Sequence, residues 1–445
     1  MRTLFILCLC LPIFSSAQDT VAVMNKGTLS GQWRTYFMMT ANKGDLKDFN
    51  ALATGGKFKY QYRLVDNLVI GAALYNSTNL GLQDLTIPDV TTGRYSRYEE
   101  GLFDRLDLEN DVIFLLGELY AKYELTKHSF TLGRMKINTP LINPQDGRMI
   151  PTLVQGFWYD YTTKKALLQF GILNEIAPRS TGKFYGIGKS IGTYPVGRNK
   201  NGTTSMYLDN TDSDYILMGN AYFNVTKNVR INVWNQYVEN VFNSFYLKPS
   251  FKLSKTVLIE GEWLHQNKVG DGGNKEESLR YFHQNTADVV GFKIAYNSKA
   301  GLISLAYDRI LPYGQFLSPR EWGREDLFSF QKRERSEGSA NSHAFVLNYK
   351  NEFEVVEDNL NVISVLSIGK HWKPEVTNAI LNKYAMPDYT HINVDVFLNL
   401  KKLKRLKPEI LLTTKVGDGS IPNNVNFYFN KVGLFHLDFI LNYNF

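Results

Sequence analysis

Three cationic side chains recur at alternate positions near the start of the chain, at Lys57, Lys59 and Arg63, with Gln61 between the last two. Successive side chains of a β-strand point to opposite faces, so in a strand these residues would share one face, with neighbours about 6.6 Å apart. A row of cations offers a dissolved carboxylate or phosphate a series of weak partners, none of which holds it permanently. The other face would carry the intervening side chains: Phe58, Tyr60, Tyr62 and Leu64.

Further cations fall at comparable positions of other predicted strands, which gives five expected solute-guiding residues: Arg34, Lys57, Lys59, Arg63 and Arg230. Acids are predicted on the same face as well: Glu118, Glu260, Glu262, Asp395 and Asp438. A plainer interpretation therefore stays open, in which cations and acids of neighbouring strands form ion pairs that stabilise the lining.

A second candidate feature is the segment 138–153, which carries Asp146 and Arg148 among three prolines and several apolar residues. Proline stiffens the backbone, and an apolar loop favours burial over exposure to water. We expect this segment to fold inward and narrow the space that the strands enclose, with Asp146 and Arg148 at or near the narrowest point. The alternative is an ordinary structured surface loop.

The end of the chain indicates what kind of element positions these side chains. Apolar side chains occupy every second position there, with Ile440 as an extra apolar residue: Phe435, Leu437, Phe439, Leu441, Tyr443 and Phe445. A soluble sheet would leave such a strand as an exposed apolar edge. A closed barrel in lipid accommodates it, because the apolar face meets hydrocarbon and the polar face lines a watery interior.

The same alternation predicts eighteen strands over residues 28–445, joined by connections of alternating length. Short connections such as 66–67 suit hairpin turns, whereas 76–114 and 311–341 are long. Short periplasmic turns and long extracellular loops are typical of outer-membrane barrels. The predicted fold class is therefore all-β, a transmembrane antiparallel β-barrel of about eighteen strands. Residues 351–359 are expected to form one of the longer turns.

The start of the chain predicts export. Apolar residues over 4–14 follow a positive start and precede small residues over 15–17, the pattern of a secretory signal peptide. We expect residues 1–17 to be removed and residues 18–445 to form a single outer-membrane β-barrel domain. Both cysteines lie in the removed part, so we expect neither a disulfide nor a thiolate metal site in the rest.

Composition agrees with a barrel in the outer membrane. Aromatic residues make up 13% of the chain, which suits the aromatic girdles of such barrels, and no later stretch has eighteen consecutive apolar residues. A formal net charge of +7 suggests attraction of anionic solutes more than nucleic-acid binding. The expected partners are outer-membrane lipid, lipopolysaccharide and small hydrophilic solutes, and assembly into a homo-oligomer stays open.

The sequence resembles the OprD family of outer-membrane porins. Residues 146–151 are similar to the Asp-(small)-Arg-x-x-Pro signature of that family's third loop, preceded by Gly133 and Arg134. Residues 319–325 together with 333–335 look like its charged seventh loop. The resemblance implies an eighteen-stranded barrel in the Gram-negative outer membrane and passive, often carboxylate-favouring uptake along a basic ladder. This chain departs from the pattern by using Lys as well as Arg in that ladder.

Other chemistry has weaker support, and we expect no catalytic residue, no cofactor and no bound metal. Residues 186–190 end like a phosphate-binding loop but lack its first glycine, and residues 209–214 lack the Gly and Glu of a calcium loop. His436 and Asp438 share a strand face, which keeps an outer-membrane barrel hydrolase as an alternative. A surface adhesin or structural barrel is the third class.

Overall fold

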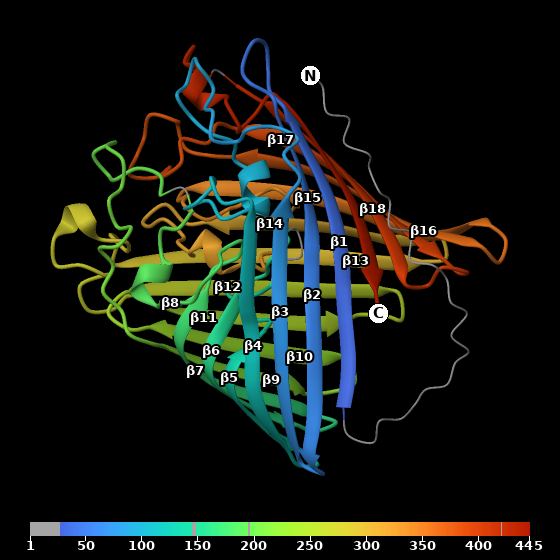
Figure 1. Cartoon of the computed structure of the whole chain (residues 1–445). Coiled ribbons are helices and arrows are strands. Elements are labelled where there is room, and N and C mark those ends of the chain that lie inside the picture. The colour runs from blue at the N-terminus through green and yellow to red at the C-terminus, as the bar shows by residue number, and fades with distance from the viewer. Residues whose placement is uncertain (1–26, 145–147, 195, 420) are drawn as a thin grey trace.

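The strands close into a ring, as the alternation predicts. In the computed structural model, β1 (Gly27–Ala41) pairs with β2 (Phe49–Val65) on one side and with β19 (Leu434–Asn444) on the other, all antiparallel (Figure 1). Closure leaves the described wall without a free edge, so every strand of it has two partners. The structure describes four stretches of the chain: residues 27–144, 148–194, 196–419 and 421–445. The expected signal peptide, residues 1–17, lies outside them.

Eighteen long strands form the wall within the described residues, as predicted. Besides the three above they are β3 (Leu68–Asn79), β4 (Val112–Glu124), β5 (His128–Met135), β6 (Leu153–Thr162), β7 (Ala166–Ala177), β9 (Ile216–Asn224), β10 (Val229–Val238), β11 (Phe242–Lys252), β12 (Val257–Lys268), β13 (Thr286–Ser298), β14 (Gly301–Ile310), β15 (Ser342–Val356), β16 (Leu360–Trp372), β17 (Tyr389–Leu400) and β18 (Leu406–Gly417). Small elements occur in the loops: β8 (Tyr185–Gly186) and the 3-10 helices η1 (Glu99–Leu102), η2 (Gly188–Ser190), η3 (Glu277–Leu279), η4 (Arg320–Trp322) and η5 (Val425–Phe427). No helix of the described chain has the length and apolar character that a membrane crossing requires.

Along the strands apolar side chains face outward and polar side chains face inward, as the alternation predicts. On β19, Phe439 is 43% exposed on the outer face, whereas His436 and Asp438 are fully buried on the inner face. On β1, Trp33 is exposed and the adjacent Arg34 is buried. An outer surface of exposed apolar side chains is unfavourable in water and favourable in hydrocarbon, so the wall is built for a bilayer.

The connections gather by length at the two ends of the barrel (Figure 1). The connections at one end are numbered in chain order, and all but the short loops 1 (42–48) and 5 (239–241) are long. The long ones are loop 2 (80–111), loop 3 (136–152), loop 4 (178–215), loop 6 (269–285), loop 7 (311–341), loop 8 (373–388) and loop 9 (418–433). Short turns such as 66–67 lie at the other end. The predicted asymmetry between short turns and long loops is therefore present.

One predicted turn was wrong. The turn is limited to residues 357–359, because β15 continues to Val356 and β16 starts at Leu360, with a bulge between Glu354 and Val356. Phe353 and Val355 continue the strand alternation past residue 350. The hairpin extends to the right of the barrel in Figure 1.

Several long loops fold into the barrel instead of covering its end. Ile142 and Ile150 of loop 3 and Trp322 of loop 7 are fully buried. Leu102 and Phe103 of loop 2 are buried as well, in a cluster that also contains residues of β1 and β2. The interior is therefore filled by loop residues packed on the inner faces of the strands, and the spaces left between them are the candidate route for a solute.

Candidate functional site

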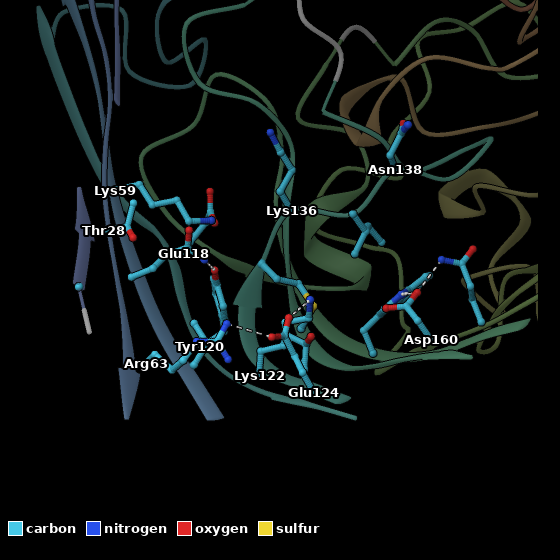
Figure 2. A pocket seen from close by; sticks show the side chains of 18 residues that line it. Thr28, Lys59, Arg63, Glu118, Tyr120, Lys122, Glu124, Lys136, Asn138 and Asp160 are labelled. Carbon is cyan, nitrogen blue, oxygen red and sulfur yellow. Dashed lines mark hydrogen bonds and ion pairs between the residues drawn. The ribbon is translucent and has the colours of Figure 1, made fainter. Parts of the chain in front are cut away.

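A cavity of about 700 Å³, which we call the inner cavity, lies beside strands β1 to β7 near the short turns. Lys59 and Arg63 of β2 point into it, and so does Lys122 of β4 (Figure 2). Two acids line the same space. Lys59 donates a 2.6 Å hydrogen bond to Glu118, and Arg63 lies 3.4 Å from a carboxylate oxygen of Glu124.

These two cations therefore form the cross-strand ion pairs of the plainer interpretation. Lys57, which occupies the same face of β2, has no carboxylate partner among the described residues. It lines a second space of about 220 Å³, the middle cavity, together with Arg34, Lys136 and Arg148. Strands and loop 3 thus bring four cations to one place.

Arg34 fixes loop 3 to the wall. Its guanidinium donates to the backbone carbonyl of Arg148 at 2.7 Å and to the side-chain carbonyl of Asn442 at 2.7 Å. Loop 3 also meets loop 7, since the backbone amide of Asn143 donates to the carbonyl of Trp322 at 3.0 Å. Arg148 is 6% exposed and stands where these elements converge. Asp146, expected beside it, lies outside the described residues.

Arg230 lies apart from the other predicted residues. It occupies the inner face of β10, where it faces Asn224 of β9 and Ser250 of β11 and is exposed. It lines neither the inner cavity nor the middle cavity. A strand register can place a residue on the inner face, but it does not bring residues from opposite sides of a barrel together.

A third space of about 60 Å³, the arginine cavity, is lined by six arginines from loops 2, 3, 4 and 7. They are Arg97, Arg148, Arg179, Arg320, Arg333 and Arg335. Three have carboxylate partners, with ion pairs from Arg320 to Glu337, from Arg333 to Asp438 and from Arg335 to Glu325. The Nε and Nη1 atoms of the buried Arg179 make no hydrogen bond within the described chain.

Tyr194 of loop 4 is buried beside this cluster. The guanidinium of Arg179 lies 4.2 Å from its ring centroid and that of Arg105 lies 4.5 Å away. Burial alone would raise the pKa of Tyr194, but the nearby Arg179, Arg148 and Arg105 outweigh it and lower the pKa to about 7. A negative phenolate is therefore accessible near neutral pH in an otherwise cationic place.

Loop 7 crosses the interior. It leaves β14 and returns to β15, yet its side chains reach β11 on one side and β19 on the other through four ion pairs. These are Asp326 with Lys248, Lys332 with Asp395, Arg333 with Asp438, and Glu334 with Lys415. The charged segment that resembles a family seventh loop is thus held inside the barrel.

The inner, middle and arginine cavities share lining residues. Lys136 lines the first two, and Arg148 lines the second and third. A chain of spaces therefore runs from the short-turn end toward the long loops, with cations along its whole length. Several of its residues were not predicted from the sequence, among them Arg97, Lys136, Arg179 and Tyr194. They lie in loops, where alternation gives no signal, although Arg97 stands between Tyr95 and Tyr98 in a conspicuous basic and aromatic stretch.

The residues behind the hydrolase alternative do lie together. His436 bonds to Thr40 through Nδ1 at 2.7 Å and to Asp438 through Nε2 at 3.3 Å, an arrangement like that of a nucleophile, a base and an orienting acid. All three side chains are fully buried, and Arg333 covers Asp438. The bond from Arg333 to Asp438 makes this cluster an attachment point of loop 7.

The structure also shows where the two weaker sequence motifs lie. Residues 186–190 span part of β8 and the one-turn helix η2, in place of the strand, loop and long helix that support a bound nucleotide. Residues 209–214 lie in loop 4. Within the described ranges, no three potential metal ligands come close enough to hold an ion.

Comparisons with known proteins show which family and which solved structures this chain is similar to. Residues 111–321 match the family model described as outer membrane porin, OprD family. Among curated proteins no sequence match was found. The matched segment runs from the start of β4 to residue 321, so it includes the whole of loop 3 and only the first part of loop 7.

Solved structures share the whole fold. OccAB3 of Acinetobacter baumannii superposes with a TM-score of 0.69 at 13% identity, covering 94% of this chain and 99% of that one. OccAB4 of the same organism gives 0.67 at 14% identity, covering 94% and 98%. OpdK of Pseudomonas aeruginosa, determined with vanillate, gives 0.66 at 13% identity, with the same coverage as OccAB4.

Proposed function

This chain belongs to the OprD family of outer membrane porins, and on that premise we propose that it passes small hydrophilic solutes through the Gram-negative outer membrane by passive diffusion, with a preference for anions. The observation that carries the proposal is the chain of cavities lined by Arg34, Lys57, Lys136 and Arg148, which connects the short-turn end to the loops. OpdK, determined with a carboxylate, supports the choice of solute class.

The guiding mechanism rests on weak, repeated attraction. A carboxylate that leaves Arg148 meets Lys57 and Lys136 next, and because neighbouring cations offer alternative partners, none of them retains the solute. Lys59 and Arg63 act differently in this proposal. Because they are paired with Glu118 and Glu124, they keep the inner cavity nearly neutral and let a solute leave toward the periplasm.

Loop 3 is the proposed constriction. Its fixed points are the bond from Arg34 to the Arg148 carbonyl and the contacts of Asn143 with loop 7, which hold the loop across the interior. We assign Arg148 to the narrowest part and expect Asp146 to face the solute from the same loop. The solute then passes between loop 3 and the cationic face of β1 and β2.

The porin function implies export of the chain and contact of the barrel with the outer membrane. Residues 1–17 would direct export and be removed, and residues 18–445 would stand as one domain in contact with outer-membrane lipid and lipopolysaccharide. The proposed transport needs no cofactor and no nucleotide, because the solute moves down its own gradient. Self-assembly through the outer wall is compatible with it.

Planar-bilayer recording of the purified barrel tests the function. We expect discrete conductance steps and a reversal potential, under a salt gradient, that indicates anion preference. Replacing Lys57, Lys59 and Arg63 together by Gln should move the reversal potential toward cations, whereas the matched control Lys227→Gln, in a short turn, should leave it unchanged. An unaltered reversal potential in the triple variant would remove these residues as the selectivity element, and a silent bilayer would refute the porin.

A further inference from the structure

A fourth space, the outer chamber, lies at the loop end of the barrel and has a volume of about 500 Å³. Loops 2, 4, 7, 8 and 9 each contribute to its lining. It continues the chain of cavities, because Arg97 and Arg320 line both the outer chamber and the arginine cavity. A solute approaching from outside meets this chamber before it meets loop 3.

The charges of the chamber are strongly unbalanced. Seven basic side chains line it, with Glu100 as the acidic one: Arg94, Arg97, Arg105, Arg198, Arg320, Lys383 and Lys431. Arg105 pairs with Glu100 at 2.5 Å, and Arg320 pairs with Glu337 at 2.6 Å. The other five have no carboxylate partner within the described residues. Like charges held together without acids are unfavourable unless an anion joins them.

Lys431 shows the imbalance most clearly. It is 9% exposed, and its ammonium donates to the backbone carbonyls of Ala385 and Asn426. Burial, and after it the positive charges of Arg94, Arg97 and Arg198, hold the pKa of Lys431 well below its usual range. These hydrogen bonds go to neutral carbonyl oxygens, and no carboxylate of the described residues pairs with Lys431.

Lys383 forms a second buried point of positive charge. It is 3% exposed and donates to the hydroxyl of Tyr207 at 3.1 Å, and its ammonium lies 4.5 Å from the centroid of that ring. Burial lowers the pKa of Lys383 to about 8. Arg198 lines the same chamber, and its Nε makes no hydrogen bond with any described residue. The Nη2 atom of Arg198 donates to the backbone carbonyls of Val376 and Asn382. The cations of these separate loops therefore bond to neutral oxygen atoms, and no carboxylate of the described residues balances their charge.

Aromatic rings complete the wall. Tyr95, Tyr384, Phe427 and Phe429 line the chamber, and the guanidinium of Arg320 lies 3.6 Å from the centroid of the Tyr384 ring. A volume near 500 Å³ falls in the range of sites for small metabolites and is far too small for a folded partner. The lining thus combines several anion donors with an apolar surface of metabolite size.

We propose that the outer chamber is a binding site for oligoanionic solutes, small organic molecules that carry two or more carboxylate or phosphate groups. The spread of cations over five loops suits a ligand whose negative groups are separated, because each group then meets its own donors. A single carboxylate would satisfy one side of the chamber and leave the rest unbalanced. This proposal rests on the proposed porin function, because the chamber would be the first site that a solute entering from outside occupies.

Equilibrium binding tests it without reliance on conductance. Protein refolded free of lipopolysaccharide is titrated calorimetrically with citrate, pyrophosphate and acetate. We expect citrate and pyrophosphate to bind with a salt-dependent affinity at least about tenfold above that of acetate, since each further charge-assisted contact contributes on that order. Affinity for acetate equal to that for citrate, or no binding of either oligoanion, would overturn the proposal.

Variants locate the site. Lys431→Gln and Arg198→Gln should each weaken citrate binding about tenfold, because each removes one unpaired cation. Lys200→Gln removes a cation from the same loop as Arg198 but outside the chamber, so it should bind like the unmodified protein. If all three variants bind alike, the chamber is not the site. Heat-modifiable electrophoretic mobility confirms that each variant is folded.

Two further measurements distinguish a site for solutes from a site for lipid, and the chamber proposal from the porin proposal. Lipopolysaccharide also carries phosphates, so its displacement of citrate from the chamber would assign the site to lipid and overturn the solute assignment. In bilayers, citrate added on the loop side should block current at lower concentration than citrate added on the turn side. A conducting barrel without citrate binding would refute the chamber alone, whereas a silent barrel that binds citrate in the chamber would refute only the porin function.

Discussion

Lys57 and Lys59 stand two positions apart on the same face of one strand, yet they have different neighbours. Lys59 is bonded to Glu118, which is 3% exposed and also accepts a 2.6 Å hydrogen bond from Tyr75. Lys57 faces Arg34, Lys136 and Arg148. The first lysine neutralises a buried acid, and the second adds to a cluster of like charge.

Substitution should separate these roles. Lys59→Gln leaves Glu118 buried without its cation, which costs about 3–5 kcal/mol and adds a net negative charge to the lining. We therefore expect lower stability to denaturant and a clear shift of the reversal potential toward cations. Lys57→Gln should shift the reversal potential with no loss of stability. The double change Lys59→Gln with Glu118→Gln should restore most of the stability, and failure to do so would show that the pair is not the cause.

Tyr194 gives a prediction for pH. With its pKa near 7, the side chain is neutral at about pH 6 and largely anionic at about pH 8, so raising the pH adds a negative charge beside Arg148 and Arg179. Anion preference should therefore fall across this interval. Reversal potentials measured at both pH values check this, and Tyr194→Phe should remove most of the dependence. A Phe variant with the same pH profile would exclude the phenolate.

Loops 3 and 7 act as one element because they contact each other at very short range. Gly323 has a φ of +145°, and a side chain there would meet the backbone of Asn143 in loop 3, with the added carbon only 2.7 Å from its amide nitrogen. Glycine alone fits such a contact. The position of Arg148 therefore depends on a residue of another loop.

Gly323→Ala should force the two loops apart. We expect a wider interior, seen as a higher single-channel conductance with weaker discrimination between anions and cations, and a modest loss of stability. Gly202→Ala serves as the control, because that glycine also has positive φ but has open space around it. Equal conductance of the two variants would show that the contact of loop 3 with loop 7 does not set the width of the route.

Strands and loops differ in how far sequence predicted them. The strands were predictable because every second residue must suit lipid and the next must suit the interior, and this gave the eighteen long strands and the faces of Arg34 and Lys57. The inward course of loop 7 depends on partners such as Asp438 and Lys415 that are distant in sequence. Gly133 marks an intermediate case: its motif was recognised, but only the structure shows the close approach of the Leu119 carbonyl that requires glycine there.

A barrel that spans the membrane requires the outer face of its strands to contact lipid. Spin labels at Leu437, Phe439 and Leu441 should be accessible to dissolved oxygen and shielded from a water-soluble nickel complex, because these side chains lie on the outer face of β19. A label at Asn444, on the other face near the turn end, should show the opposite preference. Contact of the first three with bulk buffer would contradict a barrel that spans the membrane.

Ring closure has a consequence for assembly. Gly31 and Phe445 exchange backbone hydrogen bonds of 2.8 and 3.1 Å, so the seam joins the first strand to the last residue of the chain. Pairings between segments so distant in sequence form slowly, and this one needs both ends delivered to the same place. The cylinder can therefore seal only after both its first and its last strand are present, and until then the apolar faces of the strands are exposed to aggregation.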